Sequence, residues 1–168
     1  MFNKINKLSE TEFTQVFGNI FENASWIAKK LYGHKPFKNF DDLSEKILNI
    51  FKDANFENKL RILNSHPDLA NKARVGSLTP DSNKEQNKAG LDTCTQKEFE
   101  NFNSLNIKYK NKFGFPFILA VKEKKKLEIL DIFRKRILSQ KNLEFEEAIK
   151  QVNQIAILRL KDLKNKFN

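Results

Sequence analysis

Residues 95–121 decide the fold of this chain, and they read TQKEFENFNSLNIKYKNKFGFPFILAV. Apolar side chains recur in this stretch at the three- and four-residue spacing of a helix face, at Phe99, Phe102, Leu105 and Tyr109. Gly114 and Pro116 end this pattern, because glycine favours the position just past a helix and proline cannot continue one. The stretch therefore predicts a long helix over 95–113 and then a short apolar run over 117–121.

The same spacing predicts helices along most of the chain and no strand with two-residue alternation. A helix opens at Ser9, with Glu12 completing a capping box. Asp41 or Asp42 is expected to cap another helix. The remaining expected helices end near Tyr32 or cover about 55–64, 83–91, 127–138 and 143–167, with a loop-rich stretch over 66–82. We therefore predict an all-α, single-domain compact bundle of about seven to eight helices over residues 1–168.

The composition is that of a folded protein with an excess of positive charge. The chain has 168 residues, 39% of them hydrophobic, and 16 are phenylalanines that provide a core. The formal net charge is +10, which invites a nucleic-acid interpretation. Only five of the 31 basic residues are arginines, however, and the lysines are scattered rather than gathered into a groove. We therefore expect no nucleic-acid partner, although a positive surface attracts small anions.

Several classes of site and location are disfavoured by what the sequence lacks. Cys94 is the single cysteine, so an internal disulfide and a thiolate metal cluster are excluded. The two histidines have no recognised metal-ligand spacing, so no metal is expected. No apolar run reaches the 18 residues of a membrane span, and Lys4 and Lys7 interrupt any signal peptide. A cytoplasmic protein is the resulting expectation.

The segment Ser65-His66-Pro67-Asp68-Leu69 breaks the pattern of core and surface. Pro67 disfavours helix at His66, so the imidazole lies at a bend, where it is free to face a cleft. Histidine is the side chain whose pKa suits proton transfer near neutral pH. The structural alternative is that Ser65 and Asp68 cap the next turn and His66 is an ordinary loop residue.

A second segment, Ser82-Asn83-Lys84-Glu85-Gln86, has the Ser-x-x-Glu pattern of a capping box. A structural role as a helix start is sufficient to explain it. A helix start also presents free N–H groups that favour a bound anion, with Glu85 and Gln86 beside it.

Arg159 and the apolar run after Pro116 are the other two candidates. Arg159 shares a helical stripe with apolar residues, and a buried guanidinium needs a partner. It either pairs with a core carboxylate or binds a carboxylate of a ligand. The run 117–121 is expected to be non-helical, so its backbone N–H and C=O groups need partners. Either a buried turn or a flat, amide-rich ligand could supply them.

Taken together, these segments resemble one family. The strings are Ser65-His66-Pro67-Asp68-Leu69-Ala70, Ser82-x-x-Glu85-Gln86, Ala89-Gly90-Leu91, Leu105-Asn106-x-x-Tyr109, Phe113-Gly114-Phe115-Pro116-Phe117-Ile118 and Ile155-x-x-x-Arg159-Leu160. In that order they are similar to the 2-oxo-4-hydroxy-4-carboxy-5-ureidoimidazoline (OHCU) decarboxylases of urate breakdown. Phe21-Glu22-x-x-x-Trp26 and Lys35-Pro36-Phe37 also match.

The resemblance implies an all-helical fold, no cofactor, a homodimer, and conversion of OHCU to (S)-allantoin and CO2. By matching position, His66 is the catalytic acid/base and Glu85 its partner. The residues that would contact the substrate are Pro67, Ser82, Asn83, Lys84, Glu85, Gln86, Arg159 and the backbone of Phe117, Ile118, Leu119, Ala120 and Val121. The imidazole, the carboxyl group and the guanidinium are then expected to meet around one dry cavity.

Two other classes of function are weighed against the enzyme. A helical binding module would need no water-excluded cleft, and Arg159 would pair internally. A nucleic-acid binder would show steeply salt-dependent association.

Overall fold

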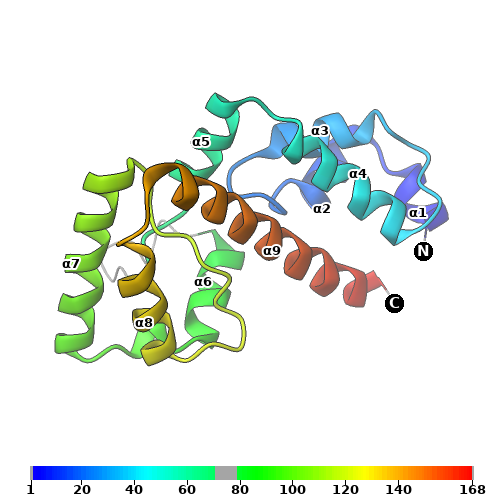
Figure 1. Cartoon of the computed structure of the whole chain (residues 1–168). Coiled ribbons are helices and arrows are strands. Elements are labelled where there is room, and N and C mark those ends of the chain that lie inside the picture. Colours follow the sequence, from blue (N-terminus) through cyan, green and yellow to red (C-terminus); the bar gives the residue numbers. More distant parts are fainter. Residues whose placement is uncertain (1, 71–78, 168) are drawn as a thin grey trace. The chain divides into compact units, whose positions relative to one another are not determined.

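The computed structural model describes residues 2–70 and 79–167, and every regular element in these two ranges is helical (Figure 1). The α-helices are α1 (Phe2–Lys7), α2 (Glu10–Phe17), α3 (Ser25–Tyr32), α4 (Phe40–Lys52), α5 (Phe56–Ser65), α6 (Pro80–Lys88), α7 (Gln96–Phe113), α8 (Lys126–Arg136) and α9 (Lys141–Phe167). A 3-10 turn, η2 (Leu91–Thr93), follows α6. The expected all-α fold is confirmed.

The chain groups into two compact units, and α5 and α9 contribute residues to both. The first unit comprises residues 1–62 and 153–168, and the second comprises residues 63–152. The prediction of one domain over 1–168 stays a prediction, as does the cytoplasmic location. In the described part of the chain, no helix has the length and apolarity needed to cross a bilayer.

In the first unit, α2 packs on α3 and α3 on α4. Aromatic rings of these helices pack on rings of the loops that connect them. Phe13 of α2 stacks on Phe37 with ring centres 5.8 Å apart, and Phe21 packs on Phe51 of α4 at 4.7 Å. All four side chains are buried. These contacts form the core that the many phenylalanines predict.

In the second unit, α7 and α8 lie side by side, with the irregular chain after α7 beside them (Figure 1). Phe117 of that irregular chain stacks on Phe133 of α8, with ring centres 3.8 Å apart and planes 10° apart. Tyr109 of α7 meets both rings edge-on, at 5.3 and 5.6 Å. The aromatic core therefore fixes the start of the run 117–121, which the sequence singles out.

Two helix starts and one helix end follow directly from local sequence. Ser9 forms the expected capping box with Glu12, and Thr95 forms another with Glu98. At the other end of α7, Gly114 takes φ 82°, a left-handed conformation that residues with a Cβ rarely adopt. The predicted helix over 95–113 is confirmed.

Two expectations about helix starts are wrong. Asn39, not Asp41 or Asp42, caps α4 through a hydrogen bond from the Asp42 N–H to its side chain, at 2.8 Å. Thr79, not Ser82, caps α6, because Pro80 fits the first helical position and shifts the start three residues earlier. Ser65 is the last residue of α5.

Further differences concern the N-terminus and the loop. The helix α1 was not expected from the sequence, because its six residues are too few to show periodicity. The expected loop-rich stretch over 66–82 is shortened at its end by α6, and residues 71–78 of it lie outside the described residues.

Replacing Thr95 by alanine is expected to destabilise the protein by about 1 kcal/mol, because α7 loses the side chain that accepts the Glu98 N–H. The measurement is urea unfolding followed by circular dichroism. Thr11→Ala is the matched control, since Thr11 is exposed within α2 and alanine favours a helix there. An equal loss of stability in both variants would contradict the capping role.

Candidate active site

His66 lies in the bend that follows α5. Its N–H donates to the Leu63 carbonyl at 3.1 Å, which closes the last turn of the helix. Pro67 prevents the helix from continuing, as the sequence predicts. His66 is 8% exposed, so the imidazole is largely withdrawn from solvent.

The segment after His66 is tied to α6 by Gln86. The side-chain carbonyl of Gln86 accepts the Ala70 N–H at 3.0 Å, and its amide nitrogen donates to the Asp68 carbonyl at 3.4 Å. Glu85, the residue next to Gln86 on α6, is half-buried. These bonds connect the backbone just after His66 with the helix that carries Glu85. The amide of Gln86 thus serves a scaffold contact that the sequence did not indicate.

The same segment is also tied to α7. Asn106 donates from its side-chain nitrogen to the Leu69 carbonyl at 3.0 Å, and Lys110 forms a salt bridge with the Asp68 carboxylate at 2.7 Å. One oxygen of Asp68 therefore pairs with a lysine of α7. Three consecutive residues after Pro67 are held from two helices, which gives the bend at His66 a fixed support.

The other positions singled out on α6 differ in exposure. Ser82 is buried, and its N–H donates to the Thr79 hydroxyl at 3.3 Å. Asn83 is half-buried and Lys84 is exposed. Ser82 therefore lies in the first turn of α6 without being the cap itself, and its N–H is already bound by Thr79.

The run Phe117–Val121 is buried and irregular throughout. The Ile118 carbonyl accepts a hydrogen bond from a terminal nitrogen of Arg136 at 2.7 Å. The Ala120 N–H donates to the side-chain carbonyl of Gln151 at 3.0 Å. Side chains of α8 and α9 therefore satisfy part of the backbone that the sequence left without partners.

Arg136 belongs to a buried polar cluster that the sequence analysis missed. One Glu144 oxygen accepts from Arg136 Nε at 2.9 Å, from a terminal Arg136 nitrogen at 2.5 Å, and from the Tyr109 hydroxyl. Burial raises the pKa of the Tyr109 phenol, and the neighbouring carboxylate of Glu144 raises it further. Tyr109 is therefore a neutral hydrogen-bond donor at neutral pH.

Arg159 is a member of the first unit and pairs there with a core carboxylate. A terminal nitrogen of Arg159 donates to Glu22 at 3.0 Å and to the Asn19 carbonyl at 3.0 Å. Both charged side chains are buried. Of the two alternatives that the sequence left open, internal pairing is found, and binding of a ligand carboxylate by Arg159 stays a prediction.

No metal site is apparent among the residues that the structure describes. Within residues 2–70 and 79–167, no three His, Cys, Asp or Glu side chains are grouped so that they could hold a metal ion. The single cysteine, Cys94, is buried next to η2.

Two solved structures share this fold. A crystal structure of (S)-allantoin synthase matches with a TM-score of 0.76 and 27% identity, covering 97% of this chain and 54% of that one. A crystal structure of OHCU decarboxylase in the presence of (S)-allantoin matches with a TM-score of 0.72 and 24% identity, covering 93% and 98% of the two chains. The second likeness concerns the fold alone. The chain thus has the fold of an OHCU decarboxylase and of about half of an (S)-allantoin synthase.

The sequence comparisons identify the family. The model of the OHCU decarboxylase family matches residues 6–161. The 2-oxo-4-hydroxy-4-carboxy-5-ureidoimidazoline decarboxylase of Halalkalicoccus jeotgali is 36% identical over 159 residues, which are 95% of this chain and 89% of that protein. This chain belongs to the OHCU decarboxylase family, and the resemblance drawn from its motifs is confirmed.

Proposed function

We propose that this chain catalyses the decarboxylation of OHCU to (S)-allantoin and CO2 in urate degradation. The observation that carries the proposal is the family match over residues 6–161, which spans every segment of the candidate site. The hydrogen bonds that join the segment after His66 to α6 support it, because they connect the backbone near the proposed acid/base with the helix of its proposed partner.

The substrate carries its own electron sink. In OHCU, a C=N bond adjoins the carbon that bears the carboxylate and the hydroxyl. When the bond to CO2 breaks, its electron pair moves toward the C=N unit and the ring nitrogen takes a proton. The resulting enol loses its hydroxyl proton and gains a proton on the neighbouring carbon, which gives allantoin. The proposed reaction therefore draws on no cofactor, and the protein supplies orientation and proton transfer.

Different residues of the site have different roles in proton transfer. His66 handles the proton at the 4-hydroxyl, and Glu85 holds its imidazole in the useful tautomer. Delivery of a proton to one face of the enol sets the (S) configuration. Burial of His66 excludes water, which would otherwise protonate either face.

Binding groups hold the substrate around that centre. In the proposal, Arg159 attracts the anionic substrate, and the stretch of α6 from Ser82 to Gln86, with Pro67, contacts its polar edge. The backbone of Phe117–Val121 binds the ring amide and the ureido arm. The charge of +10 favours arrival of an anion from solution.

We also propose that the enzyme acts as a homodimer. A second copy would cover large apolar side chains of the second unit, where Leu127 is 70% exposed and Leu138 is 81% exposed. Sedimentation equilibrium at micromolar concentration tests it. A mass of 19.7 kDa at all concentrations would identify a monomer and overturn this part of the proposal.

The activity is tested by generating OHCU in place from urate and following the circular dichroism of the product. Active protein is expected to accelerate the appearance of the (S)-allantoin signal above the spontaneous rate. A rate equal to the background, or a racemic product, would refute the proposed function.

A further inference from the structure

The irregular run Phe117–Val121 has no helix or strand ladder to fix its backbone. Two of its backbone groups are instead bound by buried side chains from neighbouring helices. Arg136 of α8 binds the Ile118 carbonyl, and Gln151 of α9 binds the Ala120 N–H, at 2.7 and 3.0 Å. Arg136 and Gln151 are 9% and 8% exposed, so neither bond is easily replaced by solvent.

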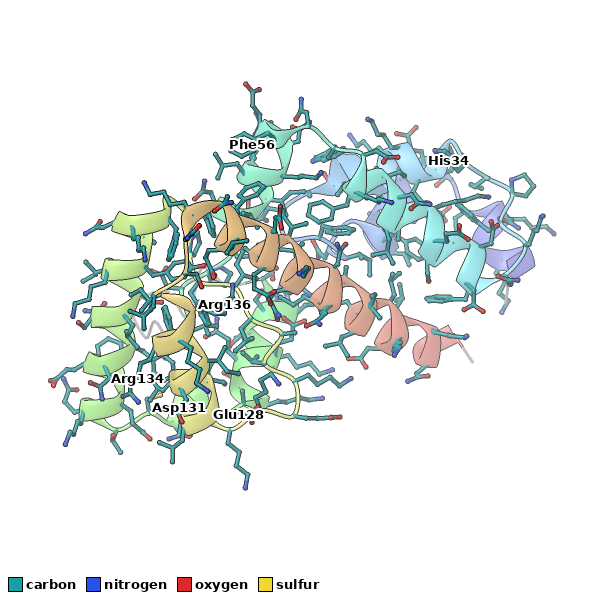
Figure 2. All side chains as sticks on the ribbon, in the orientation of Figure 1. His34, Phe56, Glu128, Asp131, Arg134 and Arg136 are labelled. Atoms are coloured by element: carbon teal, nitrogen blue, oxygen red, sulfur yellow. The ribbon has the colours of Figure 1, made fainter. Side chains whose placement is uncertain are left out.

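Arg136 is itself held in a fixed orientation. Its Nε and one terminal nitrogen bind Glu144, which is 1% exposed, and the remaining terminal nitrogen is left for Ile118. The centre of the guanidinium also lies 4.6 Å from the ring centre of Phe117. Figure 2 labels Arg136 at the end of α8, next to the start of α9. Lysine could not make this set of contacts, because it lacks the planar fork of donors.

A buried charged cluster of this kind contributes little net stability to the fold. Removing two charges from water costs several kcal/mol, and well-packed apolar residues in their place are often as stable or more stable. What the cluster provides is a defined position for one backbone carbonyl. Gln151 provides the same for one N–H, and its own amide nitrogen is held by Glu147 at 2.8 Å.

The geometry of the peptide bond determines what these two contacts leave available. In a trans peptide, the C=O and the following N–H point in opposite directions. Since the Ile118 carbonyl points to Arg136, the Leu119 N–H points away from Arg136. Since the Ala120 N–H points to Gln151, the Leu119 carbonyl points away from Gln151. Both backbone groups of Leu119 are therefore turned away from the side chains that bind the neighbouring residues.

We propose that Arg136 and Gln151 are positioning residues for the reaction, and that they orient the Leu119 backbone to bind the amide or ureido group of the substrate. Each of these groups carries an N–H beside a C=O and so complements Leu119. The inference rests on the proposed function, because it takes OHCU as the ligand.

The test compares Gln151→Met with Gln151→Glu. Methionine keeps the length of the side chain and removes the acceptor for the Ala120 N–H, whereas glutamate keeps an acceptor. Loss of this orientation is expected to raise KM for OHCU and Kd for (S)-allantoin about tenfold in Gln151→Met. We expect kcat and its pH profile to be unchanged, because His66 and Glu85 are not altered. Gln151→Glu keeps the acceptor but places a carboxylate beside Glu147, so it is expected to recover only part of the affinity.

Two further variants keep the test decisive. Gln154→Met is the matched control, since Gln154 is an exposed residue of the same helix, and it is expected to behave as the wild type. Arg136→Lys keeps a positive charge for Glu144 but loses the fork, and it is expected to raise KM and Kd in the same way even if Gln151→Met does not fold.

The outcomes separate the two proposals. Wild-type KM and Kd in both Gln151→Met and Arg136→Lys, in an enzyme that is active as the wild type, would overturn the positioning role and leave the proposed function intact. A fall in kcat with unchanged Kd would also overturn it. A wild-type protein that neither accelerates the reaction nor binds (S)-allantoin would overturn both.

Discussion

His66→Ala is expected to retain its fold and to lose about 10²–10⁴-fold in kcat, the usual contribution of a positioned acid or base. The backbone N–H of His66, which closes the last turn of α5, is kept when the side chain is replaced by alanine. The measurement is the rate of chiral product formation from OHCU, with circular dichroism of the helices as the check on folding.

The second histidine of the chain supplies the control. His34 is exposed in the loop after α3, as labelled in Figure 2, and lies in the first unit. His34→Ala is therefore expected to keep wild-type turnover. Wild-type turnover in His66→Ala would remove that residue from the mechanism.

Glu22→Ala is expected to lower the free energy of unfolding by about 3–5 kcal/mol, because it leaves the buried Arg159 without its carboxylate. Replacing both partners, as Glu22→Leu with Arg159→Met, is expected to recover much of this stability, since no buried charge then remains. The double variant is nevertheless expected to be impaired in substrate binding, with a raised KM. Urea unfolding and steady-state kinetics measure the two effects separately.

An exposed ion pair on α8 provides the matched control for stability. Arg134 and Asp131 are 3.2 Å apart, and their side chains are 54% and 66% exposed (Figure 2). Asp131→Ala is expected to change stability by less than about 1 kcal/mol, because exposed pairs contribute little. If the double variant at Glu22 and Arg159 were stable and fully active, Arg159 would be a structural residue only.

Helix starts and ends that depend on neighbouring residues were predictable from the sequence. The end of α7 at Gly114 and the start of α2 at Ser9 each depend on residues within four positions, so the pattern sufficed. The start of α6 was not predictable from this pattern, because Thr79 and Ser82 are both acceptable caps. There the rule for proline at the first helical position, applied to Pro80, would have chosen correctly.

The candidate site was predictable where it depends on motifs and not where it depends on packing. Arg136 shares a helical face with Ile129 and Phe133, seven and three residues before it, and that face is buried. The same position on an apolar helix face identified Arg159 as a buried guanidinium. The sequence therefore also indicates that Arg136 is buried. Its partner Glu144 could not be inferred, because local sequence does not determine which carboxylate of another helix reaches a buried arginine.

Central to the proposed function is that one substrate contacts His66, Glu85, Arg159 and the Leu119 backbone. A crystal structure of this protein with (S)-allantoin bound tests it most directly. The ligand is expected within hydrogen-bond distance of His66, of Arg159 and of the Leu119 N–H and carbonyl, with Glu85 beside the imidazole. A ligand bound away from His66, or one that Arg159 does not contact, would contradict the proposal.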